Sequence, residues 1–373
     1  MPSLESQARE EMLRSGPISF ARFMRLALYC PVSGYYETHD RTIGRSGDFF
    51  TSVSVGDVFG QILACRFAGW LKSIQPGPVH LVECGAHDGQ LAVDILTCLR
   101  EFEPALSSGL TYWIVEPSDV RRRRQELALA SFAPRVCWVE TLAALPTLRG
   151  VMFSNELLDA FPVHVLRWHK ASRRWVERGV TWDKASQRFA WADLPEAEIA
   201  VDHELDRAGY QVPPELSDVL PEGFTIELCP TALDWWSAAA GRLDVGWLVA
   251  CDYGATATEL LRPERVRGTL RAYRNHRSSD DVLADPGAQD LTAHVNFSAV
   301  ASAGEIAGLR TEGLWRQGEI LARWASEALA QGRFTDWAPA QRRQFQTLVH
   351  PSHLGHTFRI LVQSKGNLRA AVV

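Results

Sequence analysis

The sequence contains no C-x-x-C pair, no long apolar run and no low-complexity stretch. Its cysteines lie far apart, so neither a zinc ribbon nor a disulfide framework is indicated; they are Cys30, Cys65, Cys84, Cys98, Cys137, Cys229 and Cys251. No apolar stretch approaches the ~18 residues that span a bilayer. The first residues also lack the apolar core of a secretory signal. We therefore expect a cytoplasmic protein without a membrane span.

The charge balance gives no reason to expect a nucleic-acid partner. The chain has 39 Lys+Arg against 44 Asp+Glu, a formal net charge of -5, so it has no overall attraction to nucleic acid or to anionic membranes. The dense basic run Arg121–Arg124 begins a predicted helix, and we interpret it as a solvated face. Arginines alternate with aromatic residues at 271–276, which we interpret as a strand rather than an RNA-binding segment.

The chain is long enough for two or three domains or for one enlarged domain, since it has 373 residues and a domain has roughly 150. Before residue 76 the apolar spacing predicts helices at about 18–28 and 55–72, with an irregular glycine-rich loop at 44–52. We expect residues 1–75 to form an N-terminal helical cap with an active-site loop. Residues 76–373 are expected to form a sheet domain with an insertion at about 163–223.

From residue 76, short apolar runs alternate with helical segments, which is typical of βαβ units. The sequence predicts helices after Gly89, after Ser118 and around 231–241, and strands at 79–83, 110–116, 136–139, 151–154, 224–229 and 247–252. The fold class predicted is α/β, with a Rossmann-like, mainly parallel sheet. Its strands should end along one edge, where such sheets bind ligands.

The first strand ends in Glu83 and opens through Gly85 and Gly89 into a helix. Such a turn lets the backbone approach a ligand closely, next to a helix N-terminus. His87 stands between the two glycines, and histidine enters the positive-φ region more readily than β-branched residues do. A binding turn for S-adenosylmethionine, a dinucleotide turn and a plain tight turn all remain open on these residues alone.

Glu116 lies at the end of the next predicted strand, 116 − 89 = 27 residues beyond Gly89. A carboxylate there is placed to accept hydrogen bonds from two ribose hydroxyls. Dinucleotide-binding folds have the same feature about 20 residues on. Glu116 therefore supports a ribosyl cofactor without identifying it.

Asn155, Glu156 and Asp159 follow the fourth strand directly. Asparagine and carboxylates in this loop can hold a polar or cationic nucleophile. An arginine side chain, with a pKa above about 12, is not readily deprotonated, so carboxylates that orient it and draw off charge make chemical sense. An acidic cluster at a helix N-terminus is the plainer alternative.

In order along the chain, these segments resemble the MidA-like family of S-adenosylmethionine-dependent methyltransferases. That family includes the mitochondrial complex I assembly factor that methylates an arginine of a complex I subunit. The resemblance covers roughly 20–360, and the matching segments are 47–52 (G-D-F-F-T-S), 83–91, 115–118, 155–163 (N-E-L-L-D-A-F-P-V), 252–254, 269–276, 290–295 and 350–351. At the turn the chain reads E-C-G-A-H-D-G, where the family usually reads E-L-G-P-G-R-G.

The resemblance implies a class I methyltransferase core and S-adenosyl-L-methionine as the cofactor. The implied cofactor-binding residues are Glu83, Gly85, His87, Gly89, Glu116 and Gly47. The implied catalytic residues are Asn155, Glu156, Asp159 and Asp48, with Asp252 and Tyr253 nearby. It also implies methyl transfer to a protein arginine, in respiratory complex assembly. A homodimer is compatible with the sequence.

Three other functions remain open at this stage. One is a small-molecule methyltransferase, and another is a catalytically silent assembly or scaffold protein, suggested by His87 in the turn. The third is an NAD(P)-dependent oxidoreductase, although the G-x-G-x-x-G order is missing. His350, His353 and His356 have a three-residue spacing, but Pro351 and Gly355 disfavour a regular helix there, so we expect no metal.

Overall fold

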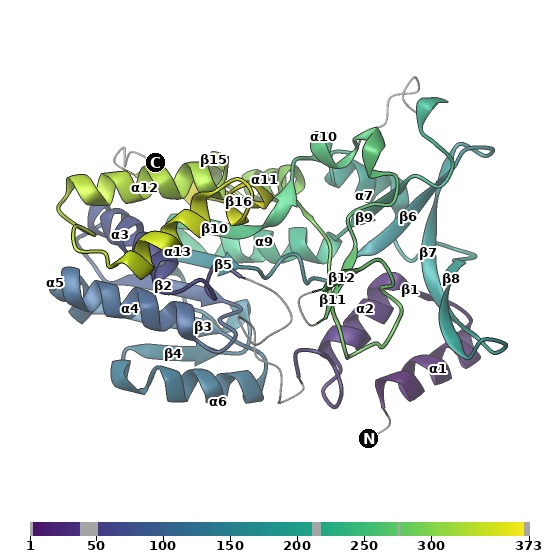
Figure 1. The fold of residues 1–373 in the computed structure, drawn as a ribbon, viewed down its shortest axis with the longest axis horizontal. Coiled ribbons are helices and arrows are strands. Elements are labelled where there is room, and N and C mark those ends of the chain that lie inside the picture. Colours follow the sequence, from purple (N-terminus) through teal and green to yellow (C-terminus); the bar gives the residue numbers. More distant parts are fainter. Residues whose placement is uncertain (1–2, 38–50, 211–217, 275–276, 369–373) are drawn as a thin grey trace. The chain divides into compact units, whose positions relative to one another are not determined.

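The computed structural model describes residues 3–37, 51–210, 218–274 and 277–368. The chain divides into two compact units, which we describe separately (Figure 1). Unit 1 comprises Met1–Phe49, Asp159–Asp234 and Gly254–Ser302, and unit 2 comprises Phe50–Leu158, Trp235–Tyr253 and Ala303–Val373. The domain boundary expected after residue 75 and the insertion expected at 163–223 stay a prediction.

Unit 2 is built on a mixed sheet. Its main path runs in the order β15 (Arg310–Arg316), β16 (Phe358–Lys365), β10 (Leu243–Ala255), β5 (Leu148–Asn155), β2 (Val79–Cys84), β3 (Leu110–Val115) and β4 (Val136–Val139). The strands from β10 to β4 pair in parallel. β16 is antiparallel to both of its neighbours. Since β2, β3, β5 and β10 point the same way, their carboxyl ends lie at one edge of the sheet.

Helices pack along the strands of this sheet (Figure 1). They are α3 (Val58–Ser73), α4 (Gln90–Phe102), α5 (Pro104–Gly109), α6 (Asp119–Ala128), α12 (Gln317–Ala330), α13 (Pro339–Val349) and α14 (Leu354–Thr357). The core between helices and strands is rich in aromatic residues. The rings of Trp70 on α3 and Trp247 on β10 stack with centroids 5.0 Å apart. Such stacking over a large buried area fixes α3 against the sheet.

Unit 1 contains antiparallel sheets. One has the path β1 (Ile18–Ser19), β7 (Arg174–Asp183), β6 (His164–His169) and β9 (Thr225–Leu228), with β8 (Arg188–Asp193) paired to β7. Another has the order β12 (Arg277–Ser279), β11 (Arg271–Arg274) and β13 (Asp290–Thr292). The helices of this unit include α1 (Leu4–Ser15), α2 (Phe20–Tyr29), α7 (Val201–Arg207) and α10 (Ala257–Leu260). Two further helices, α9 (Pro230–Arg242) and α11 (Phe297–Ile306), continue from unit 1 into unit 2.

The structure confirms the predicted α/β fold class and most of the predicted elements. The strands expected at 79–83, 110–116, 136–139, 151–154 and 247–252 are β2, β3, β4, β5 and β10, and the helices expected after Gly89, after Ser118 and around 231–241 are α4, α6 and α9. The placement of 224–229 in the parallel sheet is wrong, because β9 pairs antiparallel with β6. Burial alternates along β9, as in a strand with one covered face, whereas β10 in the main sheet is buried almost throughout its length.

Within the ranges that the structure describes, no helix is both long enough and apolar enough to cross a membrane.

Candidate cofactor-binding and active site

The turn between β2 and α4 has the backbone that a ligand-binding turn needs. Gly85 and Gly89 have φ of 77° and 86°, and His87 between them also has a positive φ, 47°. The Gly89 N–H donates to the Ala86 carbonyl over 2.7 Å, which closes the turn just before α4 begins. His87 therefore takes the left-handed conformation that glycine would adopt more easily.

This turn packs against the loop that follows β5. A Cβ atom added at Gly85 would lie 2.9 Å from Cδ1 of Leu157, closer than real Cβ contacts come. Gly85 is therefore required both for its positive φ and for the close approach of Leu157. The predicted cofactor turn and the predicted acceptor loop thus meet within unit 2.

Glu83, near the end of β2, is fully buried and faces the next strand. Its Oε2 accepts a hydrogen bond of 2.7 Å from the Tyr112 hydroxyl on β3. Burial raises the pKa of Glu83 to about 8, against the opposing effect of the Tyr112 hydrogen bond. Glu83 is thus largely protonated near neutral pH and joins two strands at the ligand-binding edge.

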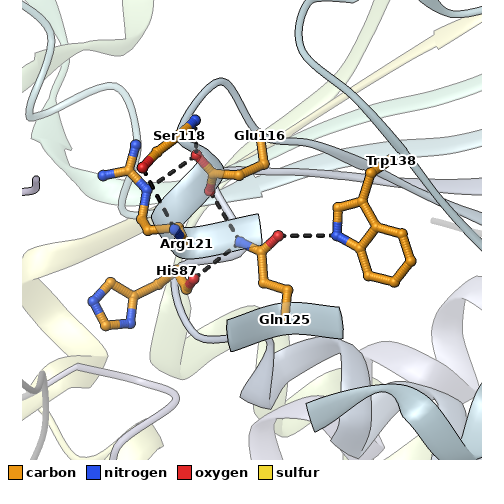
Figure 2. A network of polar contacts seen from close by, with 6 residues as sticks. All are labelled: His87, Glu116, Ser118, Arg121, Gln125 and Trp138. Carbon is orange, nitrogen blue, oxygen red and sulfur yellow. Dashed lines mark hydrogen bonds and ion pairs between the residues drawn. The ribbon is translucent and has the colours of Figure 1, made fainter. Parts of the chain in front are cut away.

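Glu116 directly follows β3 and is 3% exposed. Its Oε1 accepts hydrogen bonds from the Ser118 N–H over 2.9 Å and from Nε of Arg121 over 3.0 Å. Oε2 accepts one from Nε2 of Gln125 over 2.9 Å (Figure 2). A carboxylate has roughly four lone-pair sites, so Oε2 keeps acceptor capacity for a ligand hydroxyl.

Gln125 on α6 connects Glu116 with the turn between β2 and α4 (Figure 2). Its Nε2 also donates to the His87 carbonyl over 2.9 Å, and its Oε1 accepts from Nε1 of Trp138 on β4 over 3.0 Å. The Trp138 donor fixes which end of the amide faces Glu116 and His87, since indole Nε1 can only donate. The buried Gln125 side chain therefore hydrogen bonds to three places: the turn after β2, the residue after β3, and β4.

Asn155 is the last residue of β5, and Glu156, which follows it, adopts a backbone conformation that is uncommon for a non-glycine residue. Glu156 has a φ of 53°, and its N–H donates to the Cys251 carbonyl on β10 over 2.9 Å. Its Oε1 accepts from Nδ2 of Asn155 over 3.0 Å and from the Ser52 N–H over 3.3 Å. A positive φ in a non-glycine residue costs energy and often marks a functional position.

Asp252 on β10 holds the backbone of this loop. It is completely buried, and its Oδ2 accepts from the N–H groups of Leu157 and Leu158 over 3.1 and 2.8 Å. Oδ1 accepts from the Tyr253 N–H over 2.8 Å. These bonds to a carboxylate are strong ones and fix the path of the chain after Glu156.

Asp159 belongs to unit 1, where it is buried. Its backbone carbonyl accepts from the Ala293 N–H over 3.0 Å. Asp290 on β13, also buried, accepts from the Tyr36 hydroxyl over 2.9 Å. The pKa of Tyr36 is raised well above its usual value, mainly by burial and also by the charges of Asp290 and Asp159. Unit 1 thus contains a pair of buried carboxylates among tyrosines.

Two of the predicted site residues, Gly47 and Asp48, lie outside the described residues. The interpretation of Arg121–Arg124 as a solvated face is wrong for Arg121, whose side chain is 14% exposed and paired with Glu116. Gln125 and Tyr112 were not predicted from the sequence as site residues. A buried glutamine in an exposed arginine-rich helix carries no periodic signal, so only the tertiary contacts reveal it.

Among the described residues, His164, Glu177 and Glu198 of unit 1 form a group with metal-ligand atoms close together. His164 Nδ1 lies 2.6 Å from Oε1 of Glu177, and Oε2 of Glu177 accepts from the Glu198 N–H over 2.8 Å. These contacts already pair Glu177 with its neighbours. The absence of a metal stays an expectation.

The residues at the ends of β2, β3 and β5 fit a ribosyl cofactor. The turn has the backbone for close approach, and Glu116 is a buried acceptor with spare capacity. Oδ1 of Asn155 is buried and lacks a hydrogen-bond partner among the described residues. A buried polar atom of this kind is costly unless a ligand or water completes it.

Comparison with known proteins identifies the family. Residues 62–315, more than half of the 373, match the family described as "Putative S-adenosyl-L-methionine-dependent methyltransferase". A crystal structure of a COG1565 superfamily member from Burkholderia thailandensis bound to S-adenosyl-homocysteine is 32% identical, with a TM-score of 0.84, and the match covers 98% of this chain and 93% of that one. A native crystal structure of a COG1565 superfamily protein from that organism has a TM-score of 0.81 at 32% identity, over 99% and 93% of the two chains.

Named relatives are more distant. The "Protein arginine methyltransferase NDUFAF7 homolog, mitochondrial" of Drosophila melanogaster is 28% identical, over 99% of this chain and 86% of its own length. The human "Protein arginine methyltransferase NDUFAF7, mitochondrial" is 27% identical over 76% of this chain, and the match spans 65% of the human protein. With its sheet, its turn and these matches, the chain belongs to this family of S-adenosyl-L-methionine-dependent methyltransferases.

Proposed function

We propose that the protein transfers a methyl group from S-adenosyl-L-methionine to a guanidinium nitrogen of an arginine in a protein substrate. The observation that carries this proposal is the Glu156 carboxylate, held by Asn155 and by the Ser52 N–H in the loop that packs on the cofactor turn. The names of the relatives in Drosophila and human support the choice of arginine.

The cofactor supplies an electrophilic methyl group on a sulfonium. In this proposal Glu116 accepts hydrogen bonds from the ribose hydroxyls, and Gly85, His87 and Gly89 give the backbone room for the cofactor. Glu83 supports the turn indirectly, because its hydrogen bond from the Tyr112 hydroxyl joins β2 to β3. Gly47 and Asp48 retain their predicted roles as part of the proposal.

Glu156 orients the acceptor in this proposal. A guanidinium stays charged at neutral pH, so a carboxylate can fix one of its N–H groups and accept that proton as the new C–N bond forms. The hydrogen bonds to Oε1 from Asn155 and Ser52 hold the carboxylate in place before the substrate arrives. Pre-organisation of this kind lowers the cost of aligning the nitrogen with the methyl group.

The environment of Asp159 in unit 1 also supports a cationic acceptor. Asp159 and Asp290 are both buried. The pKa of Tyr273 is raised mainly by burial, and the charges of Asp159 and Asp290 also raise it. Carboxylates and aromatic rings are the groups that bind guanidinium best. Asp159 therefore remains the second proposed acceptor residue.

No observation favours the silent scaffold, since His87 takes the positive φ that the turn needs. The role in respiratory complex assembly and the cytoplasmic location remain expectations within this proposal. "Mitochondrial" is part of the relatives' names and describes those proteins.

The test is to incubate the purified protein with isotope-labelled S-adenosyl-L-methionine and an extract of cells that lack the gene. Mass spectrometry should find the label on arginine side chains. Glu156→Gln and Asp159→Asn should each reduce turnover by tenfold or more and leave the affinity for S-adenosylhomocysteine unchanged. Label on other side chains or only on small molecules, or full turnover by Glu156→Gln, would contradict the proposal.

A further inference from the structure

Two cysteines on neighbouring helices of unit 2 line one cavity. Cys65 lies on α3 and Cys98 on α4, and both border a cavity of about 70 Å³. Both are free thiols. Neither residue belongs to the cofactor turn or to the acceptor loop.

Close packing of α3 on α4 brings the two thiols together. A Cβ atom added at Gly60 would lie 2.5 Å from Cβ of Asp94, so the helices approach at a glycine about one turn before the cysteines. Next to this contact, the Cys98 thiol lies 3.8 Å from the Gln61 carbonyl of α3. Gln61 lies four residues before Cys65, so its carbonyl faces the Cys65 N–H within α3 and the Cys98 thiol lies beside the helical turn that carries Cys65.

The two thiols differ in environment. Cys98 is 4% exposed, whereas Cys65 is half-buried and reachable through the cavity. The neighbouring Cys98 thiol lowers the pKa of Cys65, and the charges of Arg333 and Lys72 lower it further, against the opposing effects of burial and Glu103. The pKa of Cys98 is raised mainly by the neighbouring Cys65 thiol, and burial raises it further. Cys65 is therefore the more reactive of the pair, because a disulfide in solution can reach its thiolate through the cavity, whereas Cys98 is enclosed.

The cavity also carries a positive balance of charge. Its lining includes three cationic side chains, Arg66, Lys72 and Arg333, and two anionic ones, Glu103 and Glu327. Lys72 and Arg333 both pair with Glu103, over 2.8 and 2.9 Å. Arg66 pairs with Glu327. A small anionic molecule would thus meet a weakly basic surface beside the accessible thiol.

We propose that Cys65 and Cys98 form a thiol–disulfide exchange site for anionic low-molecular-weight disulfides, of which glutathione disulfide is the probe. The Cys65 thiolate attacks one sulfur of the disulfide, which forms a mixed disulfide and releases one glutathione thiolate. Cys98 then loses its proton and attacks Sγ of Cys65, forming the Cys65–Cys98 disulfide and releasing the second glutathione. The protein loses two electrons, and the glutathione disulfide gains them as two thiols.

The test uses the full-length wild-type protein, incubated with glutathione disulfide, then alkylated and mapped by mass spectrometry. We expect a Cys65–Cys98 cross-linked peptide, reversed by reduced glutathione. Cys98→Ser should instead accumulate a glutathione adduct on Cys65, and Cys65→Ser should form neither product. Cys137→Ser, at a half-buried cysteine on β4, is the control and should cross-link like the wild type.

Wild-type protein in which both thiols remain alkylatable after the incubation, while the chain unfolded in guanidinium is oxidised, would overturn the proposal. An adduct that forms on Cys98 rather than Cys65 would overturn the assignment of the nucleophile. Because the wild-type arm needs no substitution, a variant that fails to fold does not weaken the test.

Discussion

Nε2 of Gln125 donates a hydrogen bond of 2.9 Å to Oε2 of Glu116. The same nitrogen donates to the carbonyl of His87, so the proposed ribose acceptor and the proposed cofactor turn are held by one amide. The geometry of the turn and the orientation of the carboxylate should therefore change together when Gln125 is altered.

Replacing Gln125 with glutamate should weaken the binding of S-adenosylhomocysteine. The variant loses both donors and places a second carboxylate beside Glu116, so we expect at least a tenfold loss of affinity, or about 1.4 kcal/mol. Gln125→Met removes the donors without adding charge and should give a smaller loss. Isothermal titration measures both, with Arg122→Ala as the control because Arg122 lies on the exposed side of the same helix, paired with Glu126. Wild-type affinity in Gln125→Glu would show that the amide does not orient Glu116.

His87 should tolerate glycine and resist a β-branched residue. Glycine adopts the His87 φ of 47° with little strain, which favours the folded state. Glycine also makes the unfolded chain more flexible, which offsets that gain. We expect the free energy of unfolding of His87→Gly to stay within about 1 kcal/mol of wild type, and that of His87→Val to fall by about 1–2 kcal/mol. Urea unfolding gives both values. Equal stability of the two variants would mean that the turn relaxes away from the described conformation.

Glu83 should make stability depend on pH. Its folded pKa is about 8, above its ordinary value of 4.5, so the folded state keeps a proton that the unfolded state has lost between these values. The stability that Glu83 provides relative to Glu83→Gln is therefore fully present below about pH 4.5 and is lost as the pH rises towards 8. The loss should be on the order of 2–4 kcal/mol.

The measurement is the difference in unfolding free energy between wild type and Glu83→Gln at a series of pH values. Asp94, whose pKa burial raises to about 6, titrates in both proteins, so its effect largely cancels in the difference. A difference that does not change between pH 5 and 9 would show that Glu83 is ionised in the folded state.

The sequence predicted the parts of the fold that depend on local patterns. The apolar runs that became β2, β3, β4 and β5, and the helices that follow β2 and β3, are visible because each has its own periodicity and each ends in turn residues. Glu83, Gly85, Gly89 and Glu116 could be singled out because they stand at the ends of such runs.

Other parts depend on contacts between distant residues and could not be predicted. The partner of β9 is β6, more than fifty residues earlier in the chain, and nothing local in 224–229 specifies that pairing. Tyr112 and Gln125 sit in a strand and a helix as ordinary buried residues. Their contacts with Glu83 and Glu116 arise only when the sheet assembles.

The proposed cofactor site requires Glu116 as the acceptor for a ribose hydroxyl. Isothermal titration of S-adenosylhomocysteine into Glu116→Ala tests it, with Glu126→Ala, an exposed glutamate on α6, as the matched control. The loss of a buried charged acceptor should weaken binding by about 1–3 kcal/mol, whereas the control should bind like wild type. Unchanged affinity in a folded Glu116→Ala protein would contradict the placement of the cofactor at the ends of β2 and β3.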